Sequence, residues 1–266
     1  MEKFQKYYLS LLVLVIYSNL QAQVNCKAVE GENCKKACEI FNYWGNFQGF
    51  KESQEKLDEA IDLCPSFSNA YMEKAVPYLK RGDFATWKKL IDKAVELEPQ
   101  KNLGYRGWCK YQFLRDYKGA IADIEALEKI YPTGYLGYSS NGDYELHIAK
   151  AICYSALGQK EKAISVIEDQ LSKKNHNIGL FDYYQLGVTY FELGKYDKAL
   201  ENFEKQSKQY DFAENIYYKS KVSKIRNKDY LNLKMLALKS YDEGKTMRDA
   251  YTHHFNKVYR AQIEEL

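Results

Sequence analysis

The sequence has little of what disordered, nucleic-acid-binding or membrane-spanning chains need. It contains only 4 Pro among 266 residues, and 45% of its residues are hydrophobic, so extensive disorder is not expected. Its 39 basic residues are nearly balanced by 36 acidic ones and are spread along the chain, whereas nucleic-acid binders usually gather their bases in one patch. After the first 22 residues, no apolar run is long enough to cross a bilayer. We therefore expect a folded protein without a nucleic-acid partner and without a membrane span once its leader is removed.

Sequence patterns typical of catalytic and metal sites are also absent. There is no His-Glu-x-x-His helix, no Gly-x-Ser-x-Gly turn and no Gly-rich phosphate loop. No closely spaced Cys pair stands near a His to complete a tetrahedral metal site. The carboxylates recur beside lysines, as in Glu161 and Lys162, which is typical of exposed helix faces. The sequence therefore predicts no enzyme activity, no cofactor and no metal.

The chain begins with a segment that has the pattern of an export signal. Lys3 and Lys6 provide positive charge, and an apolar run follows at residues 7–17. As a helix this run spans about 16 Å, roughly half of a ~30 Å hydrocarbon core, so a cleaved signal is favoured over a membrane anchor. We interpret residues 1–22 as a signal peptide cleaved after Ala22, and we expect the mature protein in the periplasm or outside the cell.

An internal period dominates the rest of the chain. Pro65, Pro99 and Pro132 are 34 and 33 residues apart, and each follows a stretch whose small or apolar residues share the same offsets. Because these offsets place the residues on one helical face and Pro ends the helix, each period contains a helix with a buried side. The matching residues are Ser53, Leu57 and Ala60; Trp87, Ile91 and Ala94; and Ala120, Ile124 and Leu127. A repeat of about 34 residues is typical of paired helices that stack into a solenoid.

One stretch carries a recognisable repeat signature. It reads aromatic-x-x-Leu-Gly-x-x-Tyr, followed after a turn by Ala-x-x-x-Phe, and it resembles the tetratricopeptide repeat (TPR). The signature residues are Tyr183, Leu186, Gly187, Tyr190, Gly194, Tyr196, Ala199 and Phe203. The resemblance implies an all-α solenoid of antiparallel helix pairs, with small residues where two helices cross. We expect five to six such units over residues 34–244, after an N-terminal segment at residues 23–33.

The last residues, 245–266, are expected to close the solenoid as one long helix. Thr246 is a suitable N-cap, and the apolar residues that follow lie on one helical stripe. They are Met247, Ala250, Tyr251, His254, Val258 and Ala261. A solenoid needs a terminal element with one polar side, and this segment has one. On such a helix His253 and His254 point to different sides and do not share a metal.

The resemblance also implies a binding surface. In TPR folds the first helix of each unit lines a concave groove, and here those helices carry aromatic and aliphatic residues suited to an apolar or extended peptide. The predicted groove residues are Met72, Leu79, Tyr105, Trp108, Phe181, Tyr184, Val188, Phe191 and Tyr218. We therefore predict a non-catalytic interaction module or scaffold that binds a protein or peptide partner. Packing of the same residues against the next unit or the C-terminal helix is the alternative.

A second function class remains open from the sequence. The period lengthens around residues 133–143, where an insertion rich in Tyr and Gly forms a loop between helices. A glycan can stack on aromatic rings. Glycan binding would require Trp108 to be exposed, or Tyr135 and Tyr138 to form a flat platform beside carboxylates.

Six cysteines lie in the exported part, four of them within residues 26–64. Cys34 and Cys38 share a helical face, and Cys64 ends the helix that pairs with theirs. Antiparallel pairing brings these positions together, so either Cys34–Cys64 or Cys38–Cys64 is compatible with the pattern, and Cys26 takes another partner.

Overall fold

The computed structural model describes residues 24–43, 47–132, 134–174, 176–249 and 251–266. The predicted signal peptide therefore lies outside the described residues. The chain divides after Leu97 into two compact units. Every regular element in the described residues is a helix, apart from one isolated bridge between Tyr138 and Glu145. The predicted all-α fold is confirmed.

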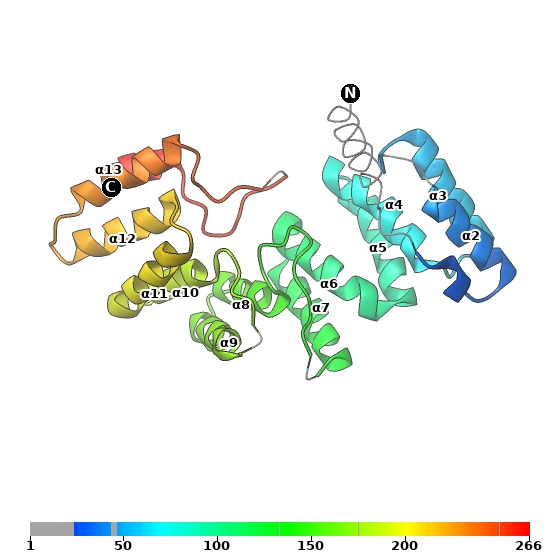
Figure 1. Cartoon of the computed structure of the whole chain (residues 1–266), viewed down its shortest axis with the longest axis horizontal. Helices are drawn as coiled ribbons and strands as arrows, with labels where there is room; N and C mark the ends of the chain where they lie inside the picture. Colours follow the sequence, from blue (N-terminus) through cyan, green and yellow to red (C-terminus); the bar gives the residue numbers. More distant parts are fainter. Residues whose placement is uncertain (1–23, 44–46, 133, 175, 250) are drawn as a thin grey trace, which may run out of the picture. The chain divides into compact units, whose positions relative to one another are not determined.

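The first unit contains two helix pairs (Figure 1). A short 3₁₀ helix, η2 (Cys26–Ala28), precedes α2 (Glu32–Asn42) and α3 (Lys51–Leu63). The second pair is α4 (Ser68–Arg81) and α5 (Phe84–Leu97), and it turns at Gly82 in a left-handed conformation that glycine adopts without strain. Each helix packs against the next one along the chain.

The second unit is likewise built from helix pairs. α6 (Pro99–Cys109), extended by a π-helical turn at η3 (Lys110–Leu114), pairs with α7 (Tyr117–Ile130). The remaining pairs are α8 (Leu146–Ala156) with α9 (Lys160–Ser172), α10 (Asp182–Glu192) with α11 (Tyr196–Gln209), and α12 (Ala213–Ile225) with α13 (Leu231–Asp242). With the two pairs of the first unit, the described residues form six helix pairs, at the upper end of the predicted five to six.

The signature residues lie at the crossing of α10 and α11. A Cβ atom added to Gly187 would lie 2.5 Å from Cε1 of Phe203, a ring that is fully buried, so only glycine lets the two helices approach this closely. Ala199, Leu186 and Tyr190 are buried around this contact. Gly194 forms the turn with a positive φ, while Tyr183 and Tyr196 are half-buried at the edges of the pair.

Two disulfides tie the start of the first unit together. Cys34 is bonded to Cys64, one of the two pairings that the sequence left open, and Cys26 is bonded to Cys38. Both bridges lie in a small core with Phe41, Leu57 and Ala60. Cys109 and Cys153, in the second unit, are free and buried.

The predicted C-terminal helix over residues 245–266 is wrong in extent. Only α14 (Arg260–Glu264) is helical, and it packs on α13 as a short closing element. Residues 246–259 are called the C-terminal segment below; its described residues, 246–249 and 251–259, form bends, turns and irregular backbone instead. The Asp249 carboxylate accepts hydrogen bonds from the backbone N–H groups of Tyr251 and Thr252, which favours a turn there over a helix.

Candidate functional site: the inner face of the second unit

The C-terminal segment lies along the first helices of several pairs. We call the residues that it contacts the inner face; they belong to η3 and the turn after it, the start of α7, the loop before α8, and α10 and α12 with the residue before α10. They are Gln112, Arg115, Tyr117, Asn141, Asp143, Tyr144, Phe181, Tyr184, Gln185 and Glu214. In Figure 1 the segment runs from the end of α13 toward the helices in the middle of the chain before it returns to α14. Residues distant in sequence therefore meet on one surface.

At α10 the inner face holds the segment mainly by its backbone. The Tyr184 hydroxyl donates to the Asn256 carbonyl (2.6 Å), and Nε2 of Gln185 donates to the Phe255 carbonyl (3.2 Å). Oε1 of Gln185 accepts from the Asn256 side chain (2.8 Å). Nearer η3, Arg115 donates to the carbonyl of His253. Contacts to carbonyl groups hold an extended chain largely without regard to its side chains, as in other forms of peptide recognition.

At α12 the segment is held by charge. Glu214 is completely buried, and its Oε1 accepts from Nζ of Lys257 (2.6 Å) and from the backbone N–H of Met247 (3.1 Å). Nζ of Lys257 also donates to the Met247 carbonyl (2.7 Å). Burial raises the pKa of Glu214, while the Lys257 ammonium opposes the rise. One carboxylate thus fixes both ends of the segment.

The sequence did not predict these polar residues. Gln185 stands between Tyr184 and Leu186, and Glu214 is in the first turn of α12; polar and charged residues at such positions normally face solvent. Their partners are about 70 and 40 residues further along the chain, in a segment predicted to be helical. A Gln and a Glu in these positions indicate a binding surface only when the structure shows that they are buried.

Most of the predicted groove residues are buried. Phe181, Tyr184 and Val188 are buried, because the rings of Phe181 and Tyr184 pack against Phe212 and the C-terminal segment covers them. Trp108 and Leu79 are also buried, whereas Met72, Tyr105, Phe191 and Tyr218 are half-buried. The alternative interpretation, packing against neighbouring elements, therefore describes most of this set in the present conformation.

The conditions set for a glycan platform are not met. Trp108 is only 7% exposed, and its ring packs against Tyr105 and Phe113. Tyr135 is 66% exposed, but its ring meets that of Tyr138 edge-on at 63° rather than forming a flat surface. Stacking of a sugar ring needs a broad aromatic face.

The insertion loop instead forms one wall of an open cleft of about 1310 Å³. The cleft is bounded by the ends of α7 and α9 and by the start of α8, and its lining mixes acids, lysines and two histidines. His147 is held between Glu145 (2.8 Å) and Glu128 (3.3 Å). Since these charges already pair with one another, the cleft does not single out a ligand.

Known proteins share the helical architecture. The tetratricopeptide-repeat profile matches residues 183–210. PilW, a type IV pilus biogenesis factor, aligns with a TM-score of 0.60 at 15% identity, over 80% of this chain and 96% of PilW. PilF of Pseudomonas aeruginosa aligns with a TM-score of 0.59 at 11% identity, over 79% of this chain and 93% of PilF. A TPR protein from Parabacteroides merdae aligns with a TM-score of 0.55 at 15% identity, over 81% of this chain and 75% of the other protein.

These likenesses in structure concern the fold. No curated protein matches the chain significantly in sequence. In the described residues no helix is both long and apolar enough to cross a membrane. One repeat, at residues 183–210, matches the tetratricopeptide-repeat model by sequence, and the other helix pairs repeat its architecture, so the chain contains a tetratricopeptide repeat within a solenoid of TPR type.

Proposed function

We propose that this protein is a non-catalytic interaction module or scaffold of the cell envelope, which binds an extended protein or peptide segment on its inner face. The observation that carries the proposal is the C-terminal segment itself. An extended chain already lies there, and Tyr184, Gln185 and Arg115 hold it by its carbonyl groups. A partner segment of similar backbone geometry would satisfy the same donors.

The chemistry of the inner face suggests what such a partner offers. The Glu214 carboxylate pairs with the Lys257 ammonium of the segment, and Gln185 accepts a hydrogen bond from the side-chain amide of Asn256. Phe255 packs edge-on against Tyr117, with ring centroids 6.0 Å apart. We infer that a partner presents an aromatic, an amide and a basic side chain in succession, and that it must displace the resident segment.

Binding in trans tests this proposal. The substitutions Asn256→Ala and Lys257→Met in the chain weaken the resident segment while leaving the inner face unchanged. A labelled peptide of residues 246–258 should then bind this variant at least about tenfold more tightly than the unsubstituted protein, because the competing segment is released. Fluorescence anisotropy gives both affinities.

The matched control uses two tyrosines on one helix. In the weakened variant, Tyr184→Phe removes the hydroxyl that donates to the Asn256 carbonyl, and it should lower peptide affinity by roughly fivefold, or about 1 kcal/mol. Tyr183→Phe changes a half-buried ring that lies toward Lys205 and should leave the affinity unchanged. Absence of peptide binding to every variant would show that the inner face does not take extended segments.

The location in the envelope rests on residues 1–22, whose pattern is that of a signal peptide. Two of the similar folds are PilW and PilF, and the first of these is a pilus biogenesis factor. Export predicts a mature chain that begins at Gln23 in the periplasm or the medium. N-terminal sequencing checks this, and an intact Met1 on the purified protein would contradict it.

A further inference from the structure

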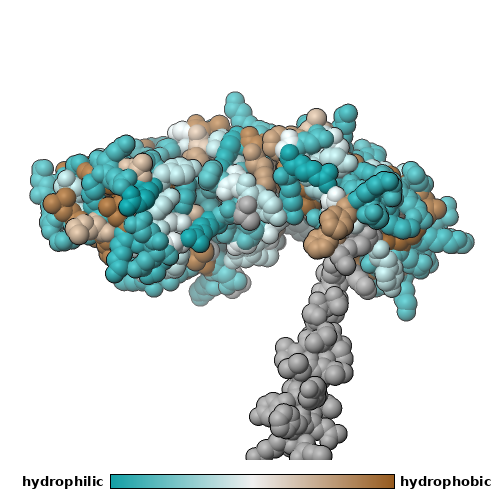
Figure 2. All heavy atoms as spheres, turned by 90° about the horizontal axis from the view of Figure 1, so that it is seen from above, coloured by the Kyte–Doolittle hydropathy of each residue, from teal (hydrophilic) through white to brown (hydrophobic). Residues whose placement is uncertain are grey.

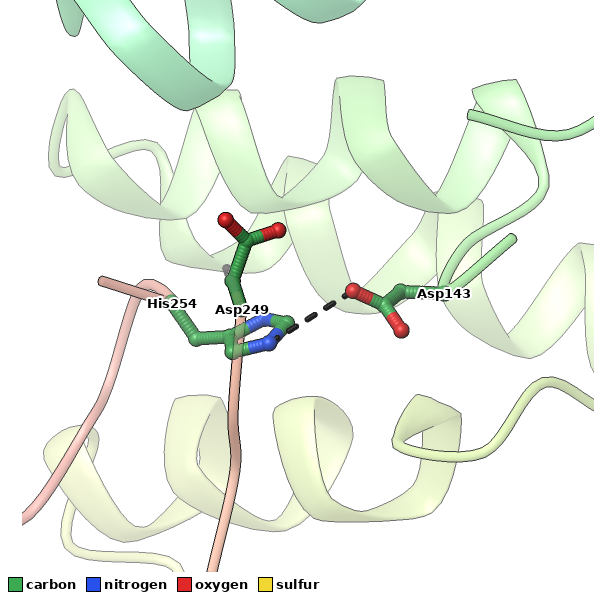
Figure 3. A group of neighbouring side chains, drawn as sticks. All are labelled: Asp143, Asp249 and His254. Atoms are coloured by element: carbon green, nitrogen blue, oxygen red, sulfur yellow. Dashed lines mark ion pairs between the residues drawn. The ribbon is translucent and has the colours of Figure 1, made fainter. Parts of the chain in front are cut away.

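Three side chains from two distant segments converge where the insertion loop meets the C-terminal segment (Figure 3). Asp143 belongs to the loop before α8, and Asp249 and His254 belong to the C-terminal segment. One oxygen of each carboxylate and one nitrogen of the imidazole all lie within 4.8 Å of one another. Nδ2 of Asn141 donates to both carboxylates, at 2.6 Å to Asp143 and 3.2 Å to Asp249.

His254 is the group that marks this cluster as more than a pair of surface acids. It is only 3% exposed, and its ring packs edge-on against Tyr144 and Phe181. Nε2 lies 3.0 Å from the Arg248 carbonyl and 3.5 Å from Oδ2 of Asp143, while the buried Nδ1 has no hydrogen-bond partner. A buried polar atom without a partner is rare in folded proteins and requires an explanation.

The imidazole has the surroundings of a metal ligand. Nε2 is the ring nitrogen that faces Asp143, and it also lies close to the Arg248 carbonyl, so a cation bound by Nε2 would have a carboxylate and a carbonyl oxygen beside it while the ring proton is on Nδ1. Figure 3 shows one ring nitrogen toward Asp143, with the Asp249 carboxylate above the ring. A neighbouring ammonium or guanidinium group would compete for this place, but no ion pair between such a group and Asp143 or Asp249 occurs in the described residues.

The carboxylates of Asp143 and Asp249 also lack a positive charge that neutralises both of them. They lie close enough for the Asn141 amide to donate to both of them. A divalent cation would neutralise both acids at once. The exposed Asn141 and Gly142 beside the cluster leave a way in from solvent.

We propose that Asp143, Asp249 and His254 bind a divalent transition-metal cation, of the class of Zn²⁺ or Mn²⁺. Two carboxylates and one imidazole suit these ions, with water or a backbone carbonyl completing the shell. Ca²⁺ prefers six to eight oxygen ligands and fits this set less well. The site goes beyond the proposed function and does not depend on any partner: the cation joins the insertion loop to the C-terminal segment.

Calorimetric titration of the purified protein with Zn²⁺, and separately with Mn²⁺ and Ca²⁺, tests the site. We expect one saturable Zn²⁺ or Mn²⁺ site and weaker Ca²⁺ binding. Asp249→Asn keeps the side-chain oxygen that accepts from Tyr251 and Thr252 but removes the charge, and it should weaken binding at least about tenfold. His254→Gln should do the same, whereas His253→Gln, at the exposed neighbouring position, should bind like the unsubstituted protein.

Proteolysis supplies a second measurement that does not require high affinity. The exposed Arg248 lies next to the ligand Asp249, so bound Zn²⁺ should slow tryptic cleavage there, while cleavage after the exposed Arg81 in the first unit stays unchanged. The proposal is overturned if neither Zn²⁺ nor Mn²⁺ shows saturable binding below millimolar concentration. It is equally overturned if Asp249→Asn and His254→Gln bind the metal as tightly as the His253→Gln control.

Discussion

Replacement of Glu214 by alanine is expected to release the C-terminal segment from the inner face. The buried carboxylate accepts from Lys257 and from Met247, so its removal leaves the Met247 N–H without an acceptor and a lysine side chain that is 11% exposed without its counter-charge. Removing one member of a buried ion pair typically costs about 3–5 kcal/mol, much of it from the uncompensated charge that stays behind. Because the segment has no regular secondary structure of its own, we expect most of this loss to appear as local opening of the segment.

Hydrogen exchange measures that opening directly. Amides of residues 247–258 and the tryptic site at Arg248 should lose protection in Glu214→Ala, while those of α8 and α9 should keep it. Glu243→Ala removes an exposed carboxylate that pairs with Lys245 just before the segment (2.9 Å), and it should barely change protection. Equal effects of the two substitutions would show that the buried pair does not hold the segment.

A double-mutant cycle separates the charge pair from the packing. Lys257→Met removes the ammonium but keeps an apolar side chain of similar length, and it leaves a carboxyl whose pKa burial already raises. The combination of Glu214→Gln with Lys257→Met should therefore cost less than the sum of the single changes. Additive losses would indicate that the two side chains act independently.

The repeated part of the fold was predictable because each unit shows the same local pattern. Pro65 and Pro99 lie just after helices, and Gly82 and Gly194 lie in turns, so the helix boundaries follow from residue types alone. Figure 2 shows hydrophobic residues in small groups among hydrophilic ones on one face, as expected when most apolar side chains lie between helices. The repeat pattern does not indicate which apolar residues are covered by a segment outside the repeats, such as the C-terminal segment.

The inner face was not predictable for the same reason. Met247, His254 and Val258 follow a helical spacing, yet each is buried against a different part of the second unit, so their period has no structural meaning. Asn141 and Asp249 are 108 residues apart and share no spacing that a sequence pattern detects. Apolar stripes predict a helix only where the segment has no stronger tertiary partners.

The two disulfides should make the first unit, but not the second, sensitive to reduction. The Cys34–Cys64 bridge spans a separation of 30 residues, and closing a loop of that length stabilises by about 3–4 kcal/mol in the chain-entropy estimate. The Cys26–Cys38 bridge spans 12 residues, for which the same estimate gives about 3 kcal/mol. Cys34→Ser with Cys64→Ser should therefore lower the free energy of unfolding of the first unit more than Cys26→Ser with Cys38→Ser.

Urea unfolding followed by hydrogen exchange in α2 and α3 measures this difference, because the first unit has its own core. Reductant should destabilise the natural chain. It should not affect a variant in which the four bonded cysteines are replaced by serine, since the two that remain, Cys109 and Cys153, are already free. Unchanged protection of α2 and α3 in reductant would contradict the role given to the bridges. Because such bridges persist in oxidising compartments, non-reducing mass mapping of the protein recovered from the periplasm or medium should find Cys34–Cys64 and Cys26–Cys38 intact.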